Sequence, residues 1–179
     1  KELDGKTPEQ YYKSFSAEQL IECLKNHLNE RVEVSDFLCE ALSDKKNENE
    51  LVKAIASDEN EEFMLYIMNM LSGIKSDKSW DRYLQFICWD YGQPIKELAT
   101  EHLREFSDKV KEQALNIFDN SESKVKEYLT EILAGCSQDD RVFNVLIDQF
   151  EKNGQNIPLY ANYLAKYGDD RALPLLMQT

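Results

Sequence analysis

Apolar residues recur at helical spacing along nearly the whole chain, in short runs that Gly, Pro, Ser and Asp interrupt. No window shows the strict alternation of apolar and polar residues that marks a half-buried strand. The pattern therefore predicts an all-α chain whose short helices come in pairs, an A helix followed by a B helix. The A helices are expected near 16–28, 49–57, 78–91, 109–119, 139–152 and 169–178, and the B helices near 31–44, 60–72, 93–106, 122–135 and 157–167.

Start and stop signals fall at the ends of these runs. Ser16 and Gln19 have the spacing of a capping box. Pro94 and Pro158 stand near first helical turns, where the missing N–H of proline costs nothing. Glycines after the apolar runs predict left-handed C-terminal caps, at Gly73, Gly92, Gly135, Gly154 and Gly168.

The B helices share one apolar register. Aligned to one another, they give five apolar columns at relative positions 0, 3, 4, 7 and 8, with successive offsets of 29, 32, 30 and 32 residues. This drifting period near 31 indicates an internal repeat. One helix pair cannot bury such a stripe alone, whereas stacked pairs bury it continuously, as in an α-solenoid. The first column is Val34, Phe63, Ile95, Val125 and Ile157, and the second is Phe37, Tyr66, Leu98, Tyr128 and Tyr160.

The A helices near the C-terminus also repeat. Asp139-Asp140-Arg141 recurs 30 residues later as Asp169-Asp170-Arg171, which is followed by Ala-Leu-Pro-Leu-Leu. This unit resembles the short HEAT-like repeats, including the type found in phycobilin lyases, and Pro174 matches the proline that bends the first helix of HEAT units. The resemblance rests on motifs over residues 120–179 and on periodicity alone over 1–119. It implies a right-handed α-solenoid of about five and a half two-helix repeats, forming a single domain over 1–179.

The charge and composition of the chain narrow the classes of partner that it can bind. Among 179 residues, 21 Lys and Arg stand against 34 Asp and Glu, a net charge of −13. This disfavours nucleic acid, whose binding depends on clustered basic charge, and no apolar run approaches the roughly 18 residues of a membrane span. The four cysteines show no C-x-x-C spacing, so we expect buried thiols in a reducing, cytoplasmic setting. Because the chain begins at Lys1 rather than Met, we expect it to be part of a longer protein.

Motifs for phosphate loops, dinucleotide binding, zinc proteases and serine hydrolases do not occur. Two histidines, His27 and His102, are too few for histidine-based catalytic or metal schemes. The expectation is therefore a non-enzymatic protein without a cofactor. His102 is the one polar residue in the apolar columns, and we interpret it as a half-buried helix histidine rather than a switch or a ligand.

Relative positions 2 and 6 of the B helices point away from the apolar stripe. In two successive helices these positions hold Glu97, Glu101, Glu127 and Glu131, and Tyr163 follows in the next. Since B helices line the concave side of an α-solenoid, these residues predict an acidic surface that binds a basic or mixed basic and aromatic protein or peptide. Tyr163 and Tyr167 lie outside the columns and either form an exposed binding edge or pack under the next repeat.

Both tryptophans fall in the segment 80–91, which supports an alternative function. The alkylpurine DNA glycosylases, a class of HEAT-like enzymes, pair tryptophans with a catalytic aspartate in a groove. That resemblance implies a catalytic or ligand-binding groove around Trp80, Trp89 and Asp90, with bilin attachment as another analogy of fold. The acidic charge opposes DNA binding, and core packing explains the aromatic residues more simply.

The last predicted A helix, residues 169–178, has no B helix after it. Apolar side chains at the end of a stack need a cap or a neighbour. We therefore expect this C-terminal edge to be covered, either by further chain or by association with another molecule.

Overall fold

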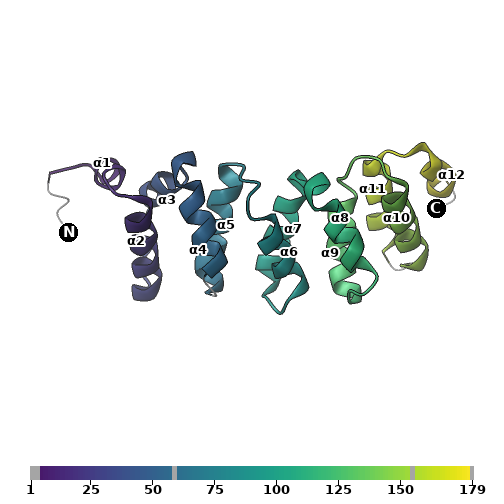
Figure 1. The fold of residues 1–179 in the computed structure, drawn as a ribbon, viewed down its shortest axis with the longest axis horizontal. Coiled ribbons are helices and arrows are strands. Elements are labelled where there is room, and N and C mark those ends of the chain that lie inside the picture. The colour runs from purple at the N-terminus through teal and green to yellow at the C-terminus, as the bar shows by residue number, and fades with distance from the viewer. Residues whose placement is uncertain (1–4, 58–59, 154–155, 178–179) are drawn as a thin grey trace. The chain divides into compact units, whose positions relative to one another are not determined.

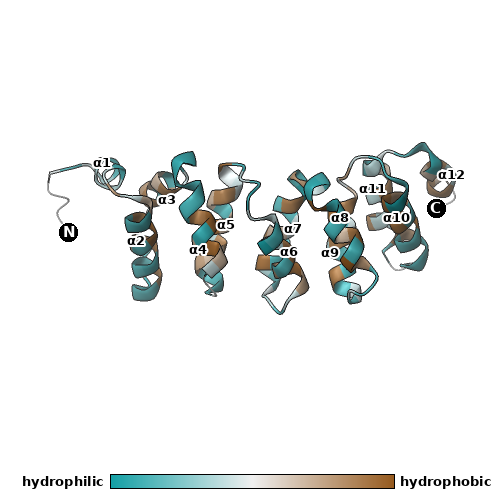
Figure 2. Cartoon of the chain, in the orientation of Figure 1, coloured by the Kyte–Doolittle hydropathy of each residue, from teal (hydrophilic) through white to brown (hydrophobic). Residues whose placement is uncertain are grey.

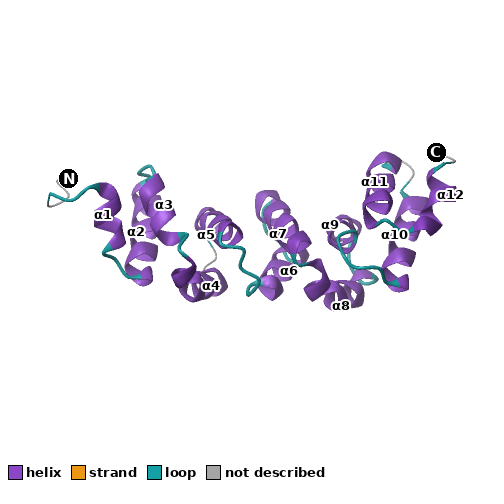
Figure 3. Ribbon diagram, turned by 90° about the horizontal axis from the view of Figure 1, so that it is seen from above, coloured by secondary structure: helices purple, strands orange, loops and turns teal. Residues whose placement is uncertain are grey.

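The computed structural model describes residues 5–57, 60–153 and 156–177, and every regular element in this part of the chain is helical (Figure 1; Figure 3). The prediction of an all-α chain is confirmed. Internal contacts group the helices into two compact units, Lys1–Ser79 and Trp80–Thr179. The single continuous solenoid stays a prediction.

The first unit contains two helix pairs and an N-terminal helix. Helix α2 (Ala17–Glu30) packs on α3 (Asp36–Leu42). A short 3-10 turn, Lys45–Asn47, then leads into α4 (Glu48–Ser57), which packs on α5 (Glu61–Gly73). Helix α2 also contacts α4 and α5, which joins the two pairs. The short α1 (Pro8–Lys13) was not predicted; it begins with a capping box between Thr7 and Gln10 and lies against α3.

The second unit continues the same alternation. Helices α6 (Trp80–Cys88) and α7 (Gln93–Glu105), α8 (Ser107–Phe118) and α9 (Ser123–Leu133), and α10 (Asp140–Lys152) and α11 (Ile157–Tyr167) form three pairs. The B helices α7 and α9 pack closely on each other, and α9 also contacts α10. A 3-10 turn, Asp170–Ala172, and the four-residue α12 (Leu173–Leu176) end the described chain.

Most apolar columns form the core, as Figure 2 illustrates by the apolar and polar bands along each helix. The third column is fully buried at Leu38, Ile67, Ala99 and Leu129. The second column departs most, because Phe37 is exposed and Tyr66, Leu98 and Tyr128 are only half-buried, although Tyr160 is buried. Ala165, the last residue of the fifth column, is also exposed. The buried arc lies further round the helix than expected, where it includes Thr100 and Thr130. Each threonine hydroxyl donates to the carbonyl four residues earlier, so these side chains enter the core with their polar group satisfied.

Several helix boundaries differ from the predicted ones. The B helix expected near 31–44 begins only at Asp36, because Arg31 takes a left-handed conformation that ends α2 and Ser35 caps α3. Helix α6 stops at Cys88, and Gly92 is the N-cap of α7 rather than the end of α6. Among the glycine caps, Gly168 has the predicted left-handed backbone, with φ of 74°. Gly73, Gly92 and Gly135 do not have a positive φ, and Gly154 lies outside the described residues.

The predicted helix 169–178 is a 3-10 turn followed by the short α12, and residues 178 and 179 lie outside the described part. Pro174 stands in the first turn of α12, so the interpretation that it bends a longer helix is wrong. Asp139 and Asp169 nevertheless repeat the same local structure. Each carboxylate accepts a hydrogen bond from the backbone N–H two residues later and pairs with that residue's guanidinium, Arg141 or Arg171.

The cysteines and His102 also depart from expectation. Cys136 is buried, but Cys23 and Cys39 are half-buried and Cys88 is exposed because it stands at the end of α6. His102 is fully in the core rather than half-buried. Its ring packs edge-on against Tyr83, with ring centroids 4.7 Å apart, and tilts against Phe106 at 5.5 Å.

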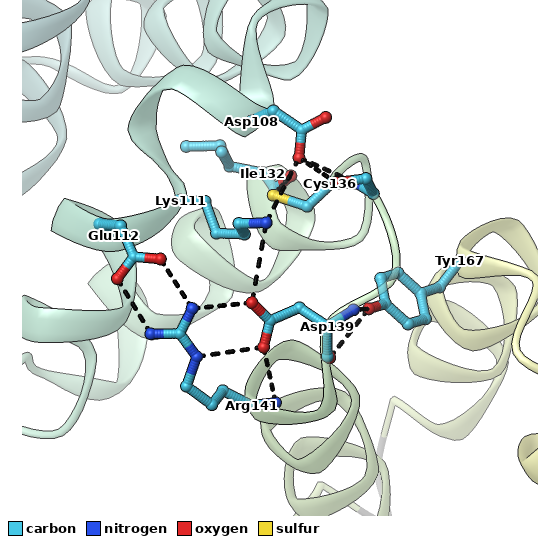
Figure 4. A network of polar contacts seen from close by, with 9 residues as sticks. Asp108, Lys111, Glu112, Ile132, Cys136, Asp139, Arg141 and Tyr167 are labelled. Carbon is cyan, nitrogen blue, oxygen red and sulfur yellow. Dashed lines mark hydrogen bonds and ion pairs between the residues drawn. The ribbon is translucent and has the colours of Figure 1, made fainter.

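Polar contacts join successive helix pairs of the second unit at a nearly constant sequence separation. Arg141 of α10 forms a bidentate pair with Glu112 of α8, and the carboxylate of Asp108 accepts from both the backbone and the hydroxyl of Ser137; both pairs are 29 residues apart (Figure 4). Arg104 and Glu131 are 27 residues apart, and Glu131 and Tyr163 are 32 apart. The period of the sequence is therefore also a period of contacts.

Candidate functional site

The four glutamates singled out by the sequence lie on two adjacent B helices of the second unit, Glu97 and Glu101 on α7 and Glu127 and Glu131 on α9. We call Glu97, Glu101, Glu127 and Glu131 the acidic surface. Within each helix the two carboxylates are four residues apart and so lie on one face, and α7 packs directly on α9. Glu97, Glu101 and Glu127 are exposed, whereas Glu131 is half-buried.

Glu131 is tied to its neighbours on both sides. One carboxylate oxygen lies 2.7 Å from the Nη1 atom of Arg104 on α7, and the other accepts a hydrogen bond of 3.3 Å from the Tyr163 hydroxyl on α11. Burial and the nearby Glu131 charge raise the pKa of Tyr163. The ring of Tyr163 packs edge-on against Tyr160, with centroids 5.9 Å apart. Three successive B helices thus meet at one carboxylate.

Tyr128 is the central aromatic residue of this surface, and the sequence assigned it to the core. It is half-buried on α9, next to Glu127 and one turn before Glu131. Burial, and then the charges of Glu97, Glu127 and Glu131, raise its pKa. The charges of carboxylates from two helices therefore act on one phenol. A column position at the edge of the apolar stripe was the only signal that could have indicated this exposure.

Of the basic residues on these helices, Lys124 of α9 is exposed three residues before Glu127, on the same side of the helix, and the others lie elsewhere or are paired. Lys126 of α9 places its ammonium 5.6 Å from the ring centroid of Phe118 on α8. Lys96 of α7 lines a separate groove at the α6–α7 loop. Arg104 is the basic residue whose paired contact lies on the acidic surface itself. Lys96 and Lys126 are thereby separated from the acidic surface, whereas Lys124 borders it and Arg104 is paired on it.

Tyr167 does not belong to an exposed edge. It is 6% exposed, and its hydroxyl accepts from the backbone N–H of Asp139 at 2.6 Å and donates to the Asp139 carbonyl at 3.0 Å (Figure 4). Neither alternative for Tyr167 holds: it packs on the start of α10, the other helix of its own pair, so it is not part of the binding surface. The Asp139 carboxylate is held by Arg141, whose guanidinium lowers its pKa.

Trp89 and Asp90 line a groove of about 680 Å³, together with Lys96 and side chains from the end of α8. Trp89 is 56% exposed because α6 ends before it. Trp80 is half-buried at the opposite end of α6 and does not line this groove. Nine residues of helix separate the two tryptophans by about 13 Å. The structure therefore does not bring Trp80, Trp89 and Asp90 together in one site.

The first unit carries a smaller version of the tyrosine and glutamate arrangement. Tyr66 of α5 is half-buried, and its pKa is raised by burial and then by Cys39, Glu62 and Glu33. Glu33, Glu62 and Tyr66 line a hollow of about 770 Å³ beside the end of α2. A tyrosine bordered by carboxylates thus occurs in both units.

The described residues contain neither a metal-binding cluster nor a membrane-spanning helix. Over 5–57, 60–153 and 156–177, no cluster of three or more His, Cys, Asp and Glu side chains has a geometry suited to a metal ion. Over the same ranges, no helix has the length and apolar content needed to cross a bilayer.

Comparison of the chain with protein-family models, with curated proteins and with solved structures gave no match. The resemblance to HEAT-like repeats therefore rests on the residues of this chain alone.

Proposed function

We propose that this protein is a non-enzymatic interaction scaffold that binds a basic, or mixed basic and aromatic, segment of another protein on its acidic surface. In this proposal the helix pairs stack as a right-handed HEAT-like α-solenoid of about five and a half repeats, with the B helices on the concave side. The contacts that recur at separations of 27 to 32 residues support such stacking. Glu97, Glu101, Glu127, Glu131 and Tyr163 are the proposed binding residues.

The observation that carries the proposal is the set of exposed carboxylates on α7 and α9 that form no ion pair. Three exposed carboxylates, Glu97, Glu101 and Glu127, form no ion pair with any described residue, although lysines stand on the same helices. A like-signed surface costs electrostatic energy that a basic partner relieves. Tyr128 and Tyr163 add aromatic area, which contributes strongly at protein interfaces.

The test is selection of binders from a displayed random-peptide library, followed by affinity measurements. We expect the enriched peptides to be rich in arginine and lysine and to bind less tightly as salt rises. The triple variant Glu97→Gln, Glu101→Gln, Glu127→Gln should lose about tenfold or more in affinity. Its matched control changes three other exposed carboxylates of the second unit, Glu105→Gln, Asp119→Asn and Glu151→Gln, with the same change in net charge.

The control distinguishes a local surface from the general acidity of the chain. Equal losses in the two triple variants would mean that peptides respond to net charge alone. Selection of neutral or acidic peptides would reject the proposed partner class.

The groove at Trp89 favours a second candidate function, ligand binding. An exposed tryptophan in a groove of about 680 Å³ offers a flat apolar face for a ring or an apolar side chain. Fragment screening by ligand-observed NMR tests it. Fragments that bind in this groove should no longer bind the variant Trp89→Ala, and they should still bind Trp80→Phe.

We also propose a cytoplasmic location. Four free thiols, one of them exposed at Cys88, suit a compartment that keeps thiols reduced.

A further inference from the structure

Arg104 is a cation of the chain itself that already occupies part of the acidic surface. Its Nη1 atom lies 2.7 Å from Glu131, its side chain is about one third exposed, and it comes from the neighbouring helix α7. Glu131 also accepts the Tyr163 hydroxyl. The chain thus shows how a guanidinium is received on this face, by a carboxylate supported by a phenol from the next helix pair.

The same elements stand unpaired a short distance along the surface. Tyr128 lies on α9 one turn before Glu131, with Glu127 beside it and Glu97 on the adjoining α7. Neither Glu97 nor Glu127 forms an ion pair within the described residues, and Glu97 accepts only a neutral hydrogen bond from the Gln93 amide. The Tyr128 hydroxyl likewise has no hydrogen-bond partner among the described side chains. A phenol and two carboxylates are therefore available together.

These groups match one kind of side chain. A guanidinium donates several N–H groups in a plane, so it can bond carboxylates on two helices while its face lies on an aromatic ring. An ammonium is a compact, strongly hydrated charge that bonds fewer groups at fixed angles. Because a guanidinium can serve two carboxylates and a ring at once, the negative charge around Tyr128 favours arginine over lysine.

We infer that an arginine of the partner binds at Tyr128 between Glu97 and Glu127, and that Arg104 competes with it by holding Glu131. This inference rests on the proposed function, and it adds which side chain of the partner binds and which residue of the chain competes with it. While Arg104 is paired, only part of the surface charge is offered to a partner. When Arg104 is removed, Glu131 faces the same site one turn from Tyr128.

The probe is a synthetic peptide of alternating arginine and glycine, compared with its lysine counterpart, and binding is measured by fluorescence anisotropy. We expect Arg104→Gln to raise the affinity for the arginine peptide by about threefold to tenfold, the size of one exposed or partly buried ion pair. The matched control is Lys152→Gln, which breaks the exposed pair between Lys152 and Asp148, 2.7 Å apart, with the same change of charge. If Arg104→Gln unfolds, Arg104→Met keeps the apolar stem that packs on the helix and serves instead.

A second pair of variants tests the position of the site. Glu97→Gln with Glu127→Gln should lose about tenfold in affinity, whereas Asp119→Asn with Glu151→Gln should change it little. Tyr128→Leu should weaken the arginine peptide more than the lysine peptide. Equal affinity of the two peptides for the wild-type protein would overturn the assignment to arginine.

The outcomes separate the two proposals. If the wild-type protein binds the arginine peptide through Glu97 and Glu127, but Arg104→Gln binds no better than Lys152→Gln, then competition by Arg104 is wrong and the proposed function stands. If no variant binds either peptide, the proposed function fails as well.

Discussion

The Tyr167 hydroxyl and the Asp139 backbone are joined twice, since the N–H of Asp139 lies 2.6 Å and its carbonyl oxygen 3.0 Å from the same phenol oxygen. This pair fixes the end of α11 to the start of α10. Removing a buried hydroxyl leaves both backbone groups without that partner, so Tyr167→Phe should destabilise the protein by about 1–3 kcal/mol. Denaturant melts measure it, with Tyr160→Phe as the control, because the Tyr160 hydroxyl has no hydrogen-bond partner among the described residues. A loss equal to that of the control would show that the two bonds contribute nothing.

The apolar columns should define stability quantitatively. Leu129 is 0% exposed in the centre of α9, so Leu129→Ala should cost about 2–5 kcal/mol through the cavity it leaves. Leu159→Ala makes the same chemical change at a position of α11 that is 42% exposed, and it should cost well under half as much. Similar urea midpoints for the two variants would show that the apolar register of α9 is wrong.

Glu48 should make the first unit sensitive to acid. Its carboxylate is nearly buried between Lys45, at 2.7 Å, and Lys78, at 2.6 Å, and hydrogen bonds from these two lysines lower its pKa to about 2. A folded-state pKa below the unfolded one gives stability that is complete above the unfolded pKa and is lost as pH falls toward the folded value. Wild-type stability should therefore decline between about pH 5 and pH 2 more steeply than that of Glu48→Gln.

The control for this pH dependence is Glu22→Gln, which changes an exposed carboxylate without an ion pair among the described residues. It should follow the wild-type curve. Thermal melts over this pH range provide the comparison, and parallel curves for Glu48→Gln and the wild type would contradict the role of the two lysines.

The four thiols should react at different rates. Burial raises the pKa of Cys136 to about 11, and its side chain is almost inaccessible, whereas Cys88 is exposed at the end of α6. Since the thiolate is the reactive form, Cys136 should be the slowest to react with a disulfide reagent in the folded protein. Cys88→Ser should remove the fastest phase. Mass spectrometry of partly labelled protein identifies the sites, and early labelling of Cys136 would contradict its burial.

The C-terminal edge should promote association. Leu159, Leu173 and Met177 are exposed on and beside the last two helices. Leu173→Ser with Met177→Ser should lower any concentration-dependent light scattering of the 179-residue chain without lowering its melting temperature. Scattering that is unaffected by this change, or a monomer at every concentration, would show that the edge needs no cover.

The sequence predicted the alternation of helices well because the apolar stripe and the capping residues act locally. Ser16 with Gln19, and the prolines near the starts of α7 and α11, lie where predicted because each needs only its own helix. What failed depends on neighbours. The rotation that buries Thr100 and Thr130 and leaves Tyr128 only half-buried is set by how α7 and α9 pack. A threonine that bonds its own helix gives no sign of burial in the sequence.

The candidate site was predicted only in part for the same reason. Glu97, Glu101 and Glu127 are exposed because they lie opposite the stripe, a local property. The pairing of Glu131 with Arg104 joins two helices across 27 residues, and no spacing within one helix reveals it. Tyr167 lies outside the columns yet is buried, because the backbone of Asp139 provides partners for its hydroxyl.

The contacts that recur about every thirty residues affect how the second unit folds and how it unfolds locally. Each of these contacts closes a loop of modest and similar length, so the entropic cost of closing the loop is nearly the same for each one. No helix pair needs a contact with a segment far away in the sequence before it can form. Folding can then begin at any helix pair and spread to its neighbours. The ends of the unit should accordingly open first in hydrogen exchange, while Glu131, held from both sides, lies in the part of the acidic surface that opens last.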